Sequence, residues 1–178
     1  MKRFFKGLFT LSVSALVFAP IFLPLEKAFA QPTGTRASYL GGGIAVGVTN
    51  GGVPGDNDDD KFGGNIQGRF AIPNAPVSAR GAFLFSGESA AIMPMISYDI
   101  PVTNNANVYL GAGYSFVTEE GKPSPLGNTD AVVLATGVEA EVNRNIVVYG
   151  DAKWGIDAYE NSSADAVSLQ VGAAYRFN

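Results

Sequence analysis

The last eleven residues before the terminal Asn alternate strictly between two kinds of side chain. In the segment 167–177 the odd positions hold Val, Leu, Val, Ala, Tyr and Phe, and the even positions hold Ser, Gln, Gly, Ala and Arg. Successive side chains of a β-strand point to opposite faces, so this pattern gives one apolar and one polar face. Such a strand fits a barrel wall with lipid outside and a polar lumen inside.

Seven further segments resemble it in length and patterning. Gly, Pro and Asn occur at the breaks between them, as turns require. Strands of about ten residues match the tilted length that crosses a bilayer. The connections alternate between long and short, which is typical of up-and-down barrels. We therefore expect an all-β fold, an eight-stranded antiparallel up-and-down transmembrane β-barrel, with strands at 38–49, 64–72, 77–86, 91–100, 107–117, 131–142, 146–156 and 166–177.

The N-terminus has the layout of a secretory signal peptide. Three basic residues lie among the first six, an apolar run occupies 7–25, and Ala28-Phe29-Ala30 supplies a small-x-small cleavage site. A transmembrane helix is the rival interpretation, but Pro20 and Pro24 interrupt the run.

That layout divides the chain into a cleavable signal peptide at 1–30 and a β-barrel domain at 31–178. The mature chain would hold 148 residues, with 15 acidic and 8 basic side chains. An acidic chain without a basic cluster is unsuited to nucleic acid. Cys and His are both absent, so disulfides and the usual nucleophile–base arrangements are unavailable and no cofactor is expected.

Strand parity leaves no charge on the apolar face, where Lys or Arg at mid-bilayer would cost about 2–4 kcal/mol. The aromatic residues of this face lie near the ends of the strands and so form two girdles, one at each rim of the barrel. Membrane interfaces favour aromatic side chains at these levels. We predict one girdle at the periplasmic rim, formed by Phe70, Tyr98, Tyr175 and Phe177. The second, at the outer rim, is formed by Phe83, Phe85, Tyr114, Phe116 and Trp154.

The opposite face carries four positive and four negative residues. A barrel of eight strands has room inside only for its own side chains, and unpaired buried charge is costly. We therefore predict a salt-bridged plug rather than a wide pore, with Gly111 and Gly113 leaving space for the longer side chains. The predicted lumen network is Arg69, Arg80, Asp99, Glu139, Glu141, Asp151, Lys153 and Arg176.

Two acidic patterns suggest chemistry only weakly. Glu139 and Glu141 share a strand face and could form an acid/base pair, but salt bridging is favoured. Asp56, Asp58 and Asp60 have the spacing of a calcium loop, although Lys61 replaces its glycine and the twelfth position holds no Glu. A solvated acidic loop is favoured here, with loose divalent-cation binding as the alternative.

The C-terminus resembles the sorting signal of bacterial outer-membrane barrels, with Gln170, Gly172, Tyr175 and Phe177 in its characteristic positions. The whole mature chain resembles the small eight-stranded barrels of the OmpA transmembrane-domain, OmpX and opacity-protein kind. This resemblance implies an outer-membrane location, contact with outer-membrane lipid and the barrel-assembly machinery, and a monomer.

The sequence is compatible with three functions. The first is a non-enzymatic integral barrel with a largely closed lumen and acidic outer loops that make surface contacts, as in structural proteins, adhesins or surface antigens. The second is a narrow porin for ions or small solutes. The third is a soluble, lipocalin-like barrel that binds a ligand among apolar residues inside. For a membrane barrel we expect both termini on the periplasmic side, because the strand number is even.

Overall fold

A computed structural model describes residues 33–49, 62–87 and 89–177. Eight antiparallel strands form a closed barrel in which each strand pairs with its sequence neighbours and β1 pairs with β8. The predicted fold class is confirmed, and strand ends differ from the prediction by two residues at most. The strands are β1 Tyr39–Gly47, β2 Phe62–Ala71, β3 Val77–Phe85, β4 Ala90–Pro101, β5 Ala106–Val117, β6 Ala131–Glu141, β7 Ile146–Ile156 and β8 Ala166–Arg176.

The predicted signal peptide, and with it the domain boundary after residue 30, lies outside the described residues. In the part of the chain that is described, no helix is both long enough and apolar enough to span a membrane.

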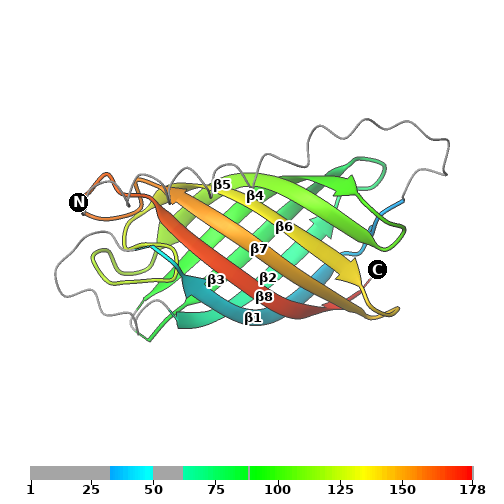
Figure 1. Cartoon of the computed structure of the whole chain (residues 1–178), viewed down its shortest axis with the longest axis horizontal. Helices are drawn as coiled ribbons and strands as arrows, with labels where there is room; N and C mark the ends of the chain where they lie inside the picture. The colour runs from blue at the N-terminus through cyan, green and yellow to red at the C-terminus, as the bar shows by residue number, and fades with distance from the viewer. Residues whose placement is uncertain (1–32, 50–61, 88, 178) are drawn as a thin grey trace, which may run out of the picture. The chain divides into compact units, whose positions relative to one another are not determined.

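The strands wind obliquely around the barrel (Figure 1). Closure depends on the pairing of β1 with β8, in which Ile44 lies opposite Val171 and Ala45 opposite Gln170. Because both strands keep the inside–outside parity of their neighbours, the inner face continues without a break across this seam. A closed barrel satisfies its backbone groups between strands and leaves no edge for pairing with another chain.

The two ends of the barrel differ. Short turns at 72–76, 102–105 and 142–145 lie at one end, here called the turn end, where β8 also finishes. The longer connections 118–130 and 157–165 lie at the other, the loop end (Figure 1). Asparagine shapes the short turns: the Asn143 side-chain oxygen accepts hydrogen bonds at 2.9 Å from the amides of both Asn145 and Ile146.

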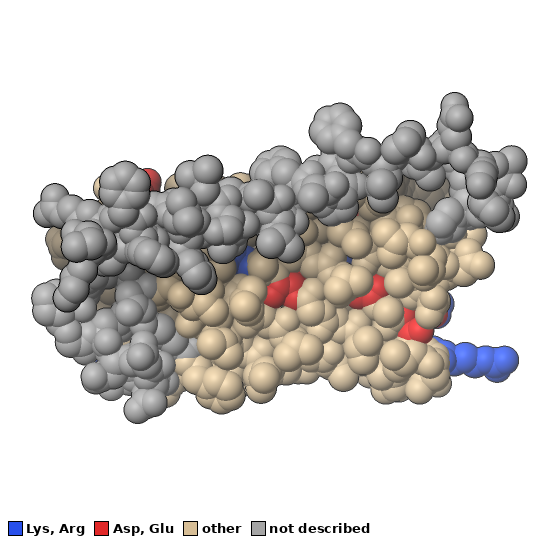
Figure 2. Space-filling model, in the orientation of Figure 1, with Lys and Arg blue, Asp and Glu red and all other residues tan. Residues whose placement is uncertain are grey.

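Large apolar side chains cover the outside of the barrel. Ile96 is 66% exposed and Leu40 58% exposed, and most outward positions of the other strands are similarly open. Figure 2 shows a wall built almost entirely of residues other than Lys, Arg, Asp and Glu, with only small charged patches. A water-soluble protein buries such residues, so this surface suits hydrocarbon.

The inward glycines of β5 lie against the neighbouring strand. A Cβ on Gly113 would lie 2.2 Å from the Pro94 carbonyl oxygen, and one on Gly111 would lie 3.2 Å from that of Ile96. Both atoms belong to the backbone of β4. These glycines therefore allow β4 and β5 to approach closely, which the sequence analysis did not predict, and the role of making room for Arg and Lys stays a prediction.

Candidate functional site in the barrel interior

The interior of the barrel has three layers along its length. Four paired charges fill the turn end, a buried lysine with polar partners lies in the middle, and an apolar group of side chains fills the loop end. Parity predicted which strand faces are inward, but not this layering.

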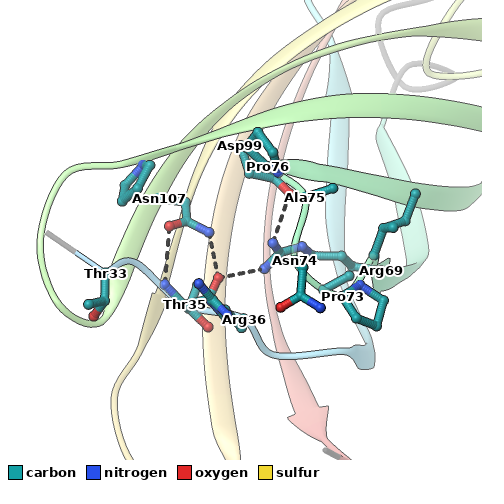
Figure 3. A pocket seen from close by; sticks show the side chains of 13 residues that line it. Thr33, Thr35, Arg36, Arg69, Pro73, Asn74, Ala75, Pro76, Asp99 and Asn107 are labelled. Carbon is teal, nitrogen blue, oxygen red and sulfur yellow. Dashed lines mark hydrogen bonds and ion pairs between the residues drawn. The ribbon is translucent and has the colours of Figure 1, made fainter.

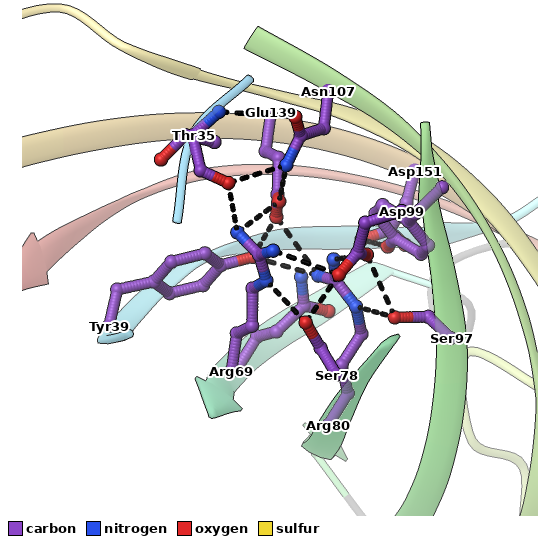
Figure 4. Close-up of polar contacts among 12 residues, drawn as sticks. Thr35, Tyr39, Arg69, Ser78, Arg80, Ser97, Asp99, Asn107, Glu139 and Asp151 are labelled. Atoms are coloured by element: carbon purple, nitrogen blue, oxygen red, sulfur yellow. Dashed lines mark hydrogen bonds and ion pairs between the residues drawn. The ribbon is translucent and has the colours of Figure 1, made fainter. Parts of the chain in front are cut away.

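Arg69, Arg80, Asp99 and Glu139 form one closed set of ion pairs, here called the ion-pair cluster (Figure 4). Arg69 reaches Asp99 at 2.8 Å and Glu139 at 2.6 Å. Arg80 reaches the same two carboxylates at 2.9 and 3.0 Å. Each carboxylate therefore bridges both guanidinium groups, and the four residues come from four strands, β2, β3, β4 and β6.

Neutral groups complete the hydrogen bonding of this cluster. The Nε of Arg80 donates to Ser97 Oγ at 2.7 Å, and that hydroxyl donates to Asp99 at 3.0 Å. Tyr39 Oη donates to Glu139 at 2.8 Å and accepts from Arg80 at 3.0 Å. Ser78 has the equivalent position between Arg69 and Asp99. Buried ion pairs are tolerated when their remaining hydrogen-bonding groups are satisfied, as here.

The segment 33–38, which precedes β1, closes the turn end beneath the cluster. Thr35 and Asn107 exchange two hydrogen bonds, at 3.1 and 2.7 Å, and Arg69 Nη1 lies 3.3 Å from the carbonyl oxygens of both Thr35 and Ala37. A cavity of ≈ 420 Å³ lies at this mouth, and Arg69 and Asp99 are among the residues that border it (Figure 3). Because those two charged side chains are already paired with each other, the inner wall of the cavity has no net charge.

Glu141 and Arg176 stand apart from the cluster. They form a 2.8 Å ion pair at the turn end with side chains 19% and 30% exposed, and the Thr35 hydroxyl also bonds to Glu141. Glu139 by contrast is completely buried and bonded to both arginines of the cluster. The two glutamates thus hold different cations, which disfavours a joint acid/base role.

Asp151 and Lys153 form the middle layer with two glutamines. Lys153 is completely buried, and its Nζ donates to Asp151 at 2.5 Å, to Gln170 at 2.9 Å and to Gln67 at 3.0 Å. Tyr109 Oη donates to the other Asp151 oxygen at 3.0 Å. Every one of the eight charges predicted for the lumen therefore has an oppositely charged partner in the structure.

Two tyrosines pack against glycines of the next strand. Tyr109 is opposite Gly137, and Tyr149 is opposite Gly172. A Cβ on Gly137 would lie 2.7 Å from the Tyr109 ring, and one on Gly172 would lie 2.4 Å from Tyr149 Oη. The Arg80 guanidinium then stacks 3.7 Å above the Tyr109 ring. The sequence analysis missed these tyrosines, although their inward parity could have indicated them.

The loop end is closed by part of the connection 118–130, which folds over the opening. Leu126 is fully buried and packs with Leu84, Met93 and Val133 from the barrel wall. We call this group, together with Ala158, the apolar cap. The sequence analysis missed it, although Leu126 is the one large apolar residue in a connection otherwise made of polar and turn-forming residues.

No group of three acidic, His or Cys side chains that could hold a metal ion occurs among the residues with described positions. The weak calcium candidates Asp56, Asp58 and Asp60 lie outside those positions. Chemically, the interior holds its charges in neutral pairs, and it is closed by the ion-pair cluster at one end and the apolar cap at the other.

Comparison with known proteins agrees with the fold. Residues 12–177 match the family described as outer membrane protein beta-barrel domain. The chain belongs to this family. As an outer-membrane β-barrel it carries its lipid-facing surface on the outside, and the family fits a bacterial outer membrane.

Solved structures of similar fold include other barrels of this kind. A de novo designed transmembrane β-barrel aligns with a TM-score of 0.54 at 12% identity, covering 80% of this chain and 98% of its own. Neisserial surface protein A aligns with a TM-score of 0.51 at 15% identity, covering 79% and 97%. At these identities the likeness is one of fold. No curated protein sequence matches the chain.

The predicted girdle aromatics and the predicted assembly signal have the following positions in the barrel wall. All nine girdle aromatics lie on the outer surface, with Phe83 half-buried and the other eight exposed. The residues of the predicted assembly signal divide between the two faces of β8. Gln170 and Gly172 face the interior, against Lys153 and Tyr149, whereas Tyr175 and Phe177 are exposed outside.

Proposed function

We propose that this protein is a non-enzymatic, closed barrel of the outer membrane that presents its loop end to the exterior. The observation that carries the proposal is the double closure of the interior. The ion-pair cluster neutralises and fills the turn end, and the apolar cap fills the loop end. An interior closed in this way holds a rigid scaffold together and leaves function to the loops.

The exposed charges favour a defined orientation. Among described residues, the turn end carries the exposed cations Arg36 and Arg144, whereas the loop end carries most of the acidic residues. We propose that the turn end, where the described part of the chain begins at Thr33 and ends at Phe177, faces the periplasm, so that both termini of the mature chain are periplasmic. In that orientation the exposed aromatics form the two interfacial girdles, and the exposed Tyr175 and Phe177 are accessible to the barrel-assembly machinery.

In this orientation the loop end is the part of the barrel that makes surface contacts. Its exposed acidic residues are Glu119, Glu120, Asp157, Glu160 and Asp165, and the one described lysine there, Lys122, pairs with Glu119 at 2.9 Å. Such a surface repels polyanions and favours cationic partners, including divalent cations from the surrounding medium. An adhesin or surface-antigen role, with the barrel as a monomer, fits this arrangement.

The two alternative functions fit less well. A narrow porin needs a continuous polar path, whereas this interior is filled at both ends. A soluble lipocalin-like barrel needs apolar residues inside and charges in water. Here six charged side chains are buried and large aliphatic residues such as Ile96 face outward.

Planar-bilayer recording tests the closure. Refolded protein is expected to give no discrete conductance steps. Leu126→Ser, which disrupts only the apolar cap, is also expected to stay silent because the ion-pair cluster remains closed. Steps in the wild type would support the porin function, and steps in Leu126→Ser alone would show that the cluster is not a seal.

Epitope insertion tests the orientation separately. A tag placed after Asn161 at the loop end should be accessible to antibody on intact cells. A tag placed after Arg144 at the turn end should be accessible only once the outer membrane is permeabilised. The reverse pattern would overturn the proposed orientation.

A further inference from the structure

The connection 118–130 turns back into the barrel mouth at residues 124–127. All four residues are buried, although they lie outside the strands. Ser124 Oγ donates to the Gly127 carbonyl oxygen at 2.6 Å and accepts from the Leu126 amide at 3.2 Å, which makes the turn tight. The Leu126 side chain belongs to the apolar cap. Connections usually run over the surface, so this one is anchored in the barrel.

Inside the mouth, Leu126 meets the other long connection, 157–165. Leu126 and Ala158 both pack against Gly155 of β7, since a Cβ built on that glycine would lie 3.5 Å from Leu126 Cγ and 3.0 Å from Ala158 Cβ. The backbones touch as well, because a Cβ on Gly127 would overlap the Ala158 carbonyl oxygen. The anchor of one connection is therefore in direct contact with the other.

Asn128 follows the turn and joins the two connections by hydrogen bonds. Its amide donates to the Ala158 carbonyl oxygen at 2.9 Å, and its side-chain oxygen accepts from the Glu160 amide at 2.7 Å. Its own carbonyl oxygen accepts from the Gly121 amide at 2.9 Å, within the connection 118–130. One residue therefore holds part of its own connection and part of the other.

Each connection is also fastened to the rim of the barrel. Tyr159 Oη donates to the Thr49 carbonyl oxygen at 2.9 Å, which ties 157–165 to the chain that follows β1. Ser86 Oγ donates to the Pro123 carbonyl oxygen at 2.9 Å, which ties 118–130 to the chain that follows β3. These bonds hold the connections to the wall, whereas the contacts of Leu126 and Asn128 hold them to each other.

We propose that the two connections form a single lid on the loop end, which opens and closes as one unit. Leu126 is its anchor in the barrel mouth, and Asn128 joins its halves. Leu126 cannot leave the mouth without breaking its contacts with Ala158, whose carbonyl oxygen Asn128 binds. Loosening of either connection is therefore transmitted to the other, as in a cooperative unit of local unfolding. The inference goes beyond the proposed function, because it concerns how the loop end moves and holds whichever partner binds there.

Amide hydrogen exchange of the protein in lipid nanodiscs, followed residue by residue by NMR, tests the coupling. Leu126→Ala removes the anchor, which belongs to 118–130. The amides of Ala158 and Ser162 belong to the other connection and donate to carbonyl oxygens within it. Their exchange should accelerate by about tenfold or more, because loss of a packed leucine populates the open form. Leu134→Ala is the matched control, since that side chain is exposed on the outside of β6, and it should leave both amides unchanged.

Asn128→Ala tests the same coupling with the anchor in place. The substitution removes the side-chain acceptor of the Glu160 amide but keeps the backbone acceptor of the Gly121 amide. Accelerated exchange at both amides is expected, because only transmission through the lid can reach Gly121. Asn104→Ala, at an exposed position in the turn 102–105, is the control and should change neither. The amides of β8 are the folding reference and should keep their wild-type rates in every variant.

Two outcomes would overturn the lid. In the first, Leu126→Ala accelerates exchange only within 118–130, and Asn128→Ala only at Glu160, so the connections move independently. In the second, neither substitution changes exchange in either connection, so these contacts hold nothing. Exchange rates report neither conductance nor orientation, so failure of this inference is distinguishable from failure of the closed-barrel proposal.

Discussion

Glu139 is the residue on which the closure of the turn end most depends. It is completely buried, and its two oxygens lie 2.6 Å from Arg69 and 3.0 Å from Arg80. Without its charge the cluster keeps two cations and one carboxylate, an imbalance that the barrel interior cannot screen.

Glu139→Gln should therefore destabilise the barrel by about 3–5 kcal/mol, the usual cost of removing one partner from a buried ion pair. Glu141→Gln is the matched control. Its partner Arg176 is partly exposed, so the loss should be about 0–1 kcal/mol. Urea unfolding in lipid vesicles, followed by tryptophan emission, measures both. Equal losses from the two variants would contradict the central role of the cluster.

The contact between Tyr149 and Gly172 gives a second test at this scale. A Cβ on Gly172 would lie 2.4 Å from Tyr149 Oη and 2.6 Å from the backbone oxygen of Gly42, so the wall must shift. Gly172→Ala should cost about 1–3 kcal/mol. Gly81→Ala is the control, because no heavy atom lies within 4 Å of a Cβ built there. That variant should be neutral or slightly stabilising in the same unfolding assay, and a comparable loss would refute the packing argument.

Sequence parity predicted the side of the wall on which each charge lies, but not its partner. Arg69, Asp99 and Glu139 are on β2, β4 and β6, which do not pair with one another. Their heights match only because of the stagger between strands, which accumulates around the barrel. Side-chain alternation contains no information on that stagger, so the pairing could not be read from the sequence.

At the level of elements, the strands were the most predictable part. Each is bounded by turn-forming residues and alternates along its length, and β7 begins and ends at the residues expected. The connection 118–130 was not predictable in the same way. Its Leu126 enters the barrel mouth because the wall there offers Leu84 and Val133, a contact between residues distant in sequence.

Strand β4 allows a test of the lipid-facing surface. Ile96 lies mid-strand and is 66% exposed, whereas Ile100 lies near the turn end. Ile96→Lys should destabilise the barrel by about 2–4 kcal/mol in a bilayer, and Ile100→Lys by about 0–1 kcal/mol. Reversible unfolding from vesicles measures the difference. Equal effects would mean that β4 does not cross the hydrocarbon in the assumed direction.

At the scale of the whole molecule, the fold is an apolar shell around a neutral, paired interior. Such an arrangement is stable only where hydrocarbon, and not water, meets the outside. The family match and the exposed aliphatic surface agree on this environment. In the orientation that we propose, the loops are the part of the molecule that contacts partners outside the cell.

The single tryptophan tests this central claim most directly. Trp154 lies on β7, 46% exposed on the outer surface and near the loop end. In vesicles containing lipids brominated along their acyl chains, its fluorescence should be blue-shifted and quenched, most strongly by bromines near the headgroups. Aqueous acrylamide should quench it little. Emission typical of water, with quenching by acrylamide and not by brominated lipid, would contradict the account.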